Sequence, residues 1–260
     1  EMAGFSFGQA DLFRRAISKK NVDKLESLKG SFIQGCIQNG KDEALARKVY
    51  DLILRFANYG FNKSHAFSYA VLTCQMAYLK VHYPKEFFCS ILDSLSPGDS
   101  KFANTLSELK EMHISLSVPD INFSEMGFVI DKNNLRFPLS LIKGLQSKFL
   151  SSIIDERMMN GKYEDIFDFA ARTKKYSLNL QTLVKLIDAG CFDSLCSSRE
   201  SLRASAYAAM EYAEMLFGTD GQQFLMEIGI SKPVLENVLD DKGINLQREY
   251  DALGMMVSDS

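Results

Sequence analysis

A polar junction between two long helical patterns constrains the fold of this chain most strongly. Apolar spacing predicts a helix that ends near Ala57, and Gly60 interrupts it before another helix begins. Four polar residues crowd this junction: Asn62, Lys63, Ser64 and His65. Because a helix N-terminus presents unpaired N–H groups and partial positive charge, a lysine and a histidine there favour bound anions. An Asn- or Ser-capped helix start with a solvated lysine is the simpler alternative.

A basic segment lies upstream of this junction. The pattern from Phe7 to Lys20 predicts a short helix in which Arg15 and Lys19 share one face, with Arg14 beside them. The planar guanidinium group of arginine suits phosphate oxygens, so the segment is a candidate anion clamp. A solvated basic face is the alternative interpretation.

Together, the two segments resemble the fingers of the bacterial replicative DNA polymerases of family C, the polymerase III α subunits. The resemblance is carried by Phe7 to Lys20 and by the run from Gly60 to Phe87, which occur in the family's order and at about its spacing. It implies a set of residues that bind the triphosphate of an incoming deoxynucleoside triphosphate: Arg14, Arg15, Lys19 and His65. It also implies that Lys63 and Ser64 help there or contact DNA.

The overall composition is that of an ordinary globular protein, with 46% apolar and 24% charged residues. Since the formal net charge is −3, any contact with DNA has to come from local basic patches. No apolar run is long enough to span a bilayer and no signal peptide is recognisable, so we expect a cytoplasmic protein without a membrane partner. The five cysteines form no CxxC pair and do not indicate a zinc site.

The pattern changes after the turn from Ser96 to Ser100. A helix to about Met112 is followed by alternating apolar residues, which predict a small strand group with a hairpin around Asp131 to Asn134. The segment around Asp120 echoes an acidic metal-binding triplet, but it holds a single carboxylate. Because two-metal phosphoryl transfer needs several converging carboxylates, we interpret Asp120 as a turn residue.

A glycine-bearing turn between two short predicted helices follows, from Leu141 to Phe149. Such a turn lets backbone N–H groups approach a DNA phosphate, and it resembles a helix-hairpin-helix element. The residues expected to contact DNA here are Lys143, Gly144, Leu145, Gln146 and Lys148, with Gln146 where a second glycine is usual.

A second copy of the hairpin is predicted from Leu183 to Asp193, with Gly190 as its candidate DNA contact. Asp188 and Asp193 make this copy less suited to phosphate. A packing turn that supports the first hairpin is therefore an equal alternative. In the resembling family, tandem hairpins also follow the fingers.

The C-terminal part is predicted to contain an alanine-rich helix from Ser198 to Phe217 and a short helix that includes Leu235 and Leu239. Between them, the run from Gln222 to Met226 fits the short pattern by which this family and other partners bind the β sliding clamp. Its expected contacts are Gln222, Leu225 and Met226. A plain loop or helix start is the alternative.

The resemblance implies a mainly α chain with a helical fingers subdomain, a small β-hairpin element and a tandem helix-hairpin-helix domain. The expected divisions are residues 1–97, 98–137, 138–196 and 197–260. The parent enzyme would transfer a nucleotidyl group from a deoxynucleoside triphosphate to a primer on template DNA, alongside other replisome subunits. Its Mg²⁺ would be held by palm residues outside this chain, so the fragment alone is expected to bind no cofactor and to be inactive. The alternative is a non-catalytic DNA-binding or scaffold module of a repair or replication protein.

Overall fold

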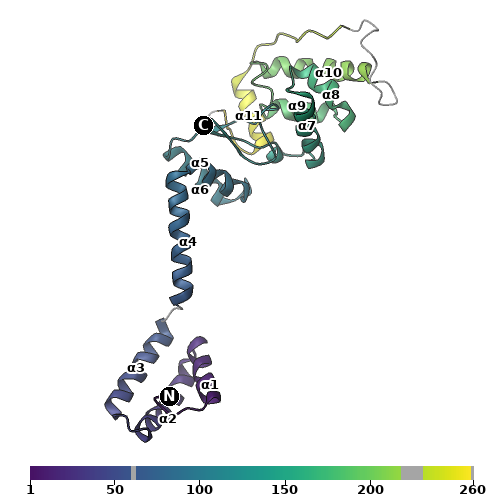
Figure 1. Ribbon diagram of the computed structural model, residues 1–260. Helices are drawn as coiled ribbons and strands as arrows, with labels where there is room; N and C mark the ends of the chain where they lie inside the picture. The colour runs from purple at the N-terminus through teal and green to yellow at the C-terminus, as the bar shows by residue number, and fades with distance from the viewer. Residues whose placement is uncertain (60–62, 218–230, 259–260) are drawn as a thin grey trace. The chain divides into compact units, whose positions relative to one another are not determined.

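The computed structural model describes residues 1–59, 63–217 and 231–258 (Figure 1). The chain is mainly α-helical, as predicted, and it carries one small three-stranded sheet. It divides into two compact units, Glu1–Ala77 and Tyr78–Ser260. The predicted domain boundary at residue 97 remains a prediction. Within the described ranges, no helix combines the length and the apolar character that crossing a membrane requires.

The first unit begins with three helices whose starts follow local capping signals. Helix α1 (Phe7–Ser18) opens with a capping box in which Ser6 and Gln9 exchange hydrogen bonds. Helix α2 (Val22–Gln38) is capped by the side chain of Asn21, as the sequence indicates. Helix α3 (Glu43–Tyr59) packs against both.

Aromatic rings hold these three helices together. The rings of Phe13 and Phe32 stack with their centroids 5.9 Å apart, and the ring of Tyr50 lies 5.2 Å from that of Phe32. The hydroxyl of the buried Tyr50 donates to the carbonyl of Leu25, which satisfies its polar atom inside the apolar cluster. The unit therefore has a small core of its own.

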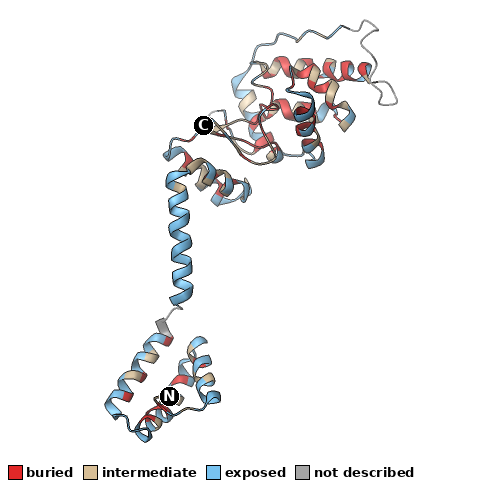
Figure 2. Cartoon of the chain, in the orientation of Figure 1, coloured by how far each residue is buried: buried red, intermediate tan, exposed pale blue. Residues whose placement is uncertain are grey.

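Helix α4 (Lys63–His82) starts where the sequence places it, and the unit boundary falls within it. None of its residues is buried, and Figure 2 shows the helix in the colour of exposed residues. Its apolar side chains lie on all sides, with Phe67, Leu72 and Val81 largely exposed. A helix that is apolar around its whole circumference is typical of a buried element.

The second unit continues with α5 (Pro84–Asp93) and α6 (Ser100–Glu111). Pro84 occupies the first turn of α5, where its missing N–H costs no helical hydrogen bond. The sheet has the order β1-β3-β2 and is formed by three short strands: β1 (Leu116–Ser117), β2 (Val129–Asp131) and β3 (Asn134–Arg136).

The predicted hairpin is present in this sheet. Strands β2 and β3 are antiparallel, with Ile130 opposite Leu135, while β1 lies parallel to β3 with Leu116 opposite Leu135. Asp120 begins a buried turn, as predicted, because its carboxylate accepts the N–H of Asn122.

The rest of the unit is a helical module. Helix α10 packs on α8 and α9, and α11 packs on α9. The elements are η1 (Leu139–Leu141), α7 (Ser147–Asn160), α8 (Ile166–Thr173), η2 (Lys174–Tyr176), α9 (Leu180–Asp188), α10 (Arg199–Leu216) and α11 (Lys242–Leu253). The sequence pattern predicted α10 closely but did not reveal α11.

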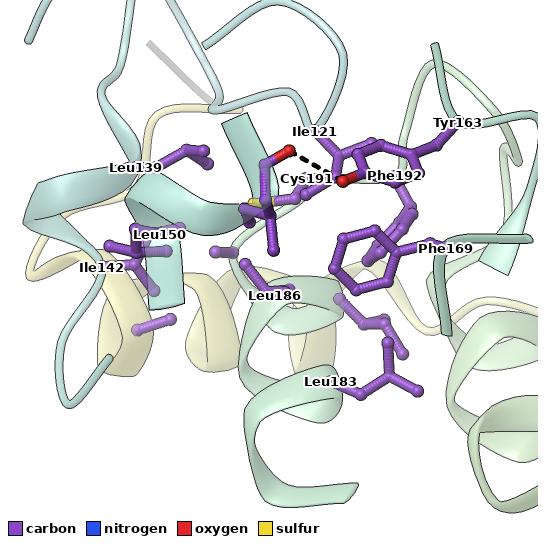
Figure 3. Close-up of a cluster of buried hydrophobic side chains, with 14 of the residues drawn as sticks. Ile121, Leu139, Ile142, Leu150, Tyr163, Phe169, Leu183, Leu186, Cys191 and Phe192 are labelled. Atoms are coloured by element: carbon purple, nitrogen blue, oxygen red, sulfur yellow. Dashed lines mark hydrogen bonds between the residues drawn. The ribbon is translucent and has the colours of Figure 1, made fainter. Parts of the chain in front are cut away.

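One apolar core lies beneath both predicted hairpins (Figure 3). Ile142 and Leu150 come from the first hairpin, and Leu183 and Leu186 come from the second; all four are almost completely buried. The ring of Phe169 lies 5.1 Å from that of Phe192 and joins α8 to this core. The two hairpins therefore form one rigidly packed module rather than two independent elements.

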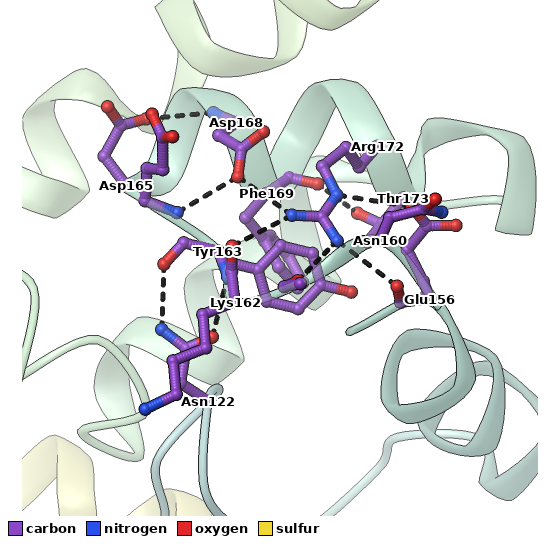
Figure 4. Close-up of polar contacts among 12 residues, drawn as sticks. Asn122, Glu156, Asn160, Lys162, Tyr163, Asp165, Asp168, Phe169, Arg172 and Thr173 are labelled. Atoms are coloured by element: carbon purple, nitrogen blue, oxygen red, sulfur yellow. Dashed lines mark hydrogen bonds and ion pairs between the residues drawn. The ribbon is translucent and has the colours of Figure 1, made fainter. Parts of the chain in front are cut away.

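A polar network fixes the connection between α7 and α8 (Figure 4). Arg172 donates to the carbonyl oxygens of Gly161 at 2.8 Å and Lys162 at 3.1 Å, and its guanidinium also contacts the carboxylate of Glu156. Burial raises the pKa of Glu156. Hydrogen bonds from four side chains outweigh this effect and lower that pKa to about 2: Lys175, Asn160, Tyr176 and Arg172. The ionised carboxylate therefore anchors the loop between the two hairpins.

The predicted short helix around Leu235 and Leu239 is wrong. Residues 231–240 are extended along α10, and Leu239 is 92% exposed. The hydroxyl of Ser201 both accepts the N–H of Val238 and donates to its carbonyl, while Ser205 accepts the N–H of Glu236. Because serines of α10 satisfy these backbone groups, the segment is held extended without helical hydrogen bonds.

Candidate nucleic-acid interface

The first hairpin has the backbone geometry that its glycine suggests. Gly144 adopts φ +73°, a left-handed conformation that favours glycine, between η1 and α7. Lys143, Gly144, Gln146 and Lys148 are exposed, whereas Leu145 is half-buried against the core. The turn therefore presents its polar side to solvent while one side chain anchors it.

The N-terminus of α7 lies at this exposed turn. Gln146 occupies the N-cap position, but its side chain makes no capping hydrogen bond. The first N–H groups of the helix therefore lack the side-chain acceptor that commonly satisfies them. An anion such as a phosphate is a suitable acceptor for such groups, because the helix dipole is positive there.

Lysines surround the turn without acidic partners. Neither Lys143 nor Lys148 forms an ion pair with any residue in the described ranges. The backbone N–H of Lys143 donates to the carbonyl of Ala252 at 2.9 Å, and its ammonium lies 5.9 Å from the ring of Tyr250. Helix α11, which the sequence did not reveal, thus positions one of the predicted DNA-binding residues.

Lys185 is a further basic residue at this turn, and no motif in the sequence indicates it. It belongs to α9, and its Nζ donates to the carbonyl oxygen of Gly144 at 3.4 Å. The two residues are 41 positions apart. No spacing rule connects them, since only the packing of the second hairpin on the first brings them together.

The second hairpin turns its glycine towards the protein. Gly190 has φ +84° and is buried, and an added Cβ would lie only 2.5 Å from a guanidinium nitrogen of Arg199. Arg199 Nε donates to Asp193 Oδ1 at 2.8 Å across the turn. Burial raises the pKa of Asp193, although its bonds to Arg199 oppose that shift. This geometry favours the packing turn over a DNA contact at Gly190.

On α1, the predicted triphosphate-binding arginines share one carboxylate. Asp11 Oδ1 accepts from Arg14 Nη2 at 2.8 Å, and Asp11 Oδ2 accepts from Arg15 Nε at 2.7 Å. The hydrogen bond from Arg14 lowers the pKa of Asp11, and together with the charge of Arg15 it outweighs desolvation, which raises that pKa. Both guanidinium groups remain largely exposed, and Lys19 is exposed at the end of the helix. The role of Asp11 in orienting them was not foreseen from the sequence.

The remaining predicted nucleotide-binding residue, His65, lies at the start of α4 together with Lys63 and Ser64, which are predicted to help there or contact DNA. Lys63 is its first residue, Ser64 accepts the hydroxyl of Ser68 at its carbonyl, and the ring of His65 lies 4.5 Å from that of Tyr69. Residues 60–62, which connect α3 to α4, are outside the described residues. The convergence of the α1 arginines with His65 therefore stays a prediction.

The predicted clamp-binding residues Gln222, Leu225 and Met226 also lie outside the described residues. Across the part of the chain that is described, no group of three or more His, Cys, Asp or Glu side chains is placed to hold a metal ion. The acidic residues noted above bind arginine, lysine or backbone groups instead.

Two family models match this chain. Residues 1–40 match the finger domain of the bacterial DNA polymerase III alpha subunit, and residues 113–202 match the helix-hairpin-helix motif. The first match contains α1, and the second contains both hairpins.

Curated relatives agree with these matches. DNA polymerase III subunit alpha of Bacillus subtilis is 39% identical over 234 residues, which cover 89% of this chain and 21% of that protein. The subunit of Staphylococcus epidermidis is 42% identical over 202 residues, or 78% of this chain and 19% of that protein. The subunit of Staphylococcus aureus is 37% identical over 258 residues, or 98% of this chain and 24% of that protein. The chain thus spans about a fifth to a quarter of the length of these relatives.

Proposed function

Because the chain belongs to the family of bacterial DNA polymerase III alpha subunits, we propose that it serves as the fingers and helix-hairpin-helix segment of a replicative DNA-directed DNA polymerase. The order of the two matched regions, fingers first and hairpins second, supports this proposal. A scaffold or repair module would use the hairpins alone, so the match over residues 1–40 favours the polymerase.

The first hairpin is the proposed contact with the backbone of duplex DNA. The observation that carries this proposal is the exposed turn at Gly144, where the α7 N-terminus lacks a side-chain cap. Lys143 and Lys148 at this turn form no ion pair with an acid among the residues that the structure describes. Phosphate contacts of this kind hold the protein on the duplex without reading sequence. In a polymerase, these contacts would hold the newly formed duplex after nucleotides have been added.

In the fingers, Arg14, Arg15, Lys19 and His65 are proposed to bind the triphosphate, with Lys63 and Ser64 helping there or contacting the template. Asp11 keeps the first two guanidinium groups oriented before the nucleotide arrives. Their contribution to nucleotidyl transfer would be positioning and charge stabilisation. Mg²⁺ is proposed to be held by palm residues outside this chain, and the isolated chain is proposed to be inactive.

Replacing Lys148 by alanine is expected to weaken the binding of duplex DNA by the full chain. Because each phosphate contact releases counterions, the slope of log affinity against log salt should become shallower by about one unit. Fluorescence anisotropy with a labelled duplex over a salt series measures this slope. Lys101, which is exposed on α6 without an ion pair among the described residues, is the matched control. An unchanged slope in Lys148→Ala would contradict the proposed interface.

Binding to the β sliding clamp is proposed for the segment from Gln222 to Met226. Deleting these five residues from the full chain should abolish the capture of immobilised clamp in surface plasmon resonance. A variant with the same five residues in scrambled order controls for the length of the connection. Retained binding in the deletion variant would place the clamp contact elsewhere in this chain and would contradict the assignment to this segment.

A further inference from the structure

Lys185 extends from the second hairpin to the turn of the first. Its Nζ lies 3.4 Å from the carbonyl oxygen of Gly144, at the long end of hydrogen-bond distances. A side chain in place of Gly144 would overlap that ammonium group. The absence of a Cβ at Gly144 thus gives the lysine of α9 access to the exposed turn.

The charge of Lys185 has no acidic partner in the described part of the chain. The two acids of the second hairpin are already engaged, since Asp188 pairs with Arg203 and Asp193 pairs with Arg199. A single long bond to a neutral carbonyl is weak compensation for a full positive charge, because hydrogen bonds to ionised acceptors are shorter and about twice as strong. The lysine is therefore available to an anion at the turn.

The two hairpins contribute differently to this region. Arg199 covers the turn of the second hairpin at Gly190, so that turn is filled by the protein itself. The first turn is exposed, with Lys143 on one side and Lys148 in the first turn of α7. What the second hairpin adds at the first turn is the side chain of Lys185.

We propose that Lys185 is a phosphate-binding residue of the first hairpin, supplied by the second hairpin. When a phosphodiester of duplex DNA binds at Gly144, the ammonium of Lys185 exchanges its weak hydrogen bond to the carbonyl for a charge-assisted hydrogen bond to the phosphate. The tandem arrangement then builds one phosphate site from two hairpins. The inference rests on the proposed binding of duplex DNA by the first hairpin.

The test compares Lys185→Ala with the wild-type chain and with Lys101→Ala, using a labelled blunt duplex over a salt series. We expect Lys185→Ala to bind the duplex more weakly and to lose about one unit of salt slope, as one phosphate contact would. Lys185→Arg should restore the slope, because the charge is retained. The double variant Lys148→Ala/Lys185→Ala should lose about two units, because the two lysines bring separate charges.

The outcomes separate this inference from the proposed function. If the wild-type chain shows no salt-dependent binding of the duplex, the proposed function of the hairpin fails. If Lys148→Ala lowers the slope while Lys185→Ala behaves like Lys101→Ala, only the assignment of Lys185 is overturned. Equal melting temperatures of the variants ensure that the comparison concerns folded chains.

Discussion

Replacing Arg199 by alanine is expected to destabilise the second unit by about 3–5 kcal/mol, because it leaves the buried carboxylate of Glu249 without its cation. Glu249 is completely buried and accepts from Arg199 Nη1 at 2.8 Å. Asp193 is bound by the same guanidinium group on its other side. These bonds join the turn of the second hairpin to α10 and α11, so their loss should be felt across the helical module.

The carboxylate of Glu249 also fixes the segment after α11. It accepts the backbone N–H groups of Val257 at 2.6 Å and Ser258 at 2.8 Å. If Arg199 is absent, Glu249 remains buried with neutral donors only, which is a costly position for a full negative charge. Changing Glu249 to glutamine in the Arg199→Ala background should therefore recover part of the lost stability.

Urea unfolding, monitored by hydrogen exchange of the α9 and α10 amides, measures this loss of stability. A readout local to the second unit is needed because the chain has two compact units, which can unfold separately. Lys174→Ala is the control, because Lys174 pairs with the exposed Glu214 and such surface pairs contribute about 0–1 kcal/mol. If Arg199→Ala is no more destabilising than Lys174→Ala, the buried ion network does not stabilise the module.

Local signals in the sequence predicted most of the helices. Asn21 caps α2 and Pro84 opens α5 at the positions expected, because these effects act within one helical turn. The β2–β3 hairpin followed in the same way from alternation around a polar turn. Such features need no knowledge of the tertiary structure.

Features that depend on packing were not predictable. Residues 231–240 carry apolar spacing typical of a helix, yet serines of α10 hold them extended. Lys185 and Gly144 meet only because the two hairpins share one core. Similarly, the sequence left a DNA contact and a packing turn at Gly190 as equal alternatives, because it does not show that Arg199, from the next helix, covers this turn.

The fingers contain one feature that the local sequence predicted and one that it did not. The sequence indicated that Arg14 and Arg15 lie side by side on a helix, and α1 places them so. It did not reveal that Asp11, one helical turn earlier, bonds to both. An acid three and four residues before two basic residues can pair with either, and the choice depends on side-chain rotamers that a pattern does not specify.

Replacing Arg14 by alanine in the complete polymerase should lower kcat/KM for nucleotide incorporation by about tenfold to a hundredfold. That range corresponds to the loss of one hydrogen bond between charged groups, about 1.5–3 kcal/mol. Because the triphosphate is proposed to be gripped by Arg14 and Arg15 together, the double alanine variant should lose more than either single variant. Arg14→Lys should recover only part of the loss, since an ammonium group lacks the planar fork that matches phosphate oxygens.

Single-nucleotide incorporation on a defined primer-template, measured over a range of nucleotide concentrations, tests this expectation. Arg47→Ala is the matched control, because Arg47 is also an exposed helical arginine and is paired with Glu43 four residues away. It should leave the kinetics unchanged, which separates the loss of an arginine on the surface from the loss of a nucleotide contact. Unaltered kinetics in Arg14→Ala would remove that residue from the proposed triphosphate site. If Arg47→Ala lowers kcat/KM as much as Arg14→Ala does, the surface charge of the fingers, rather than a specific contact with the triphosphate, governs incorporation.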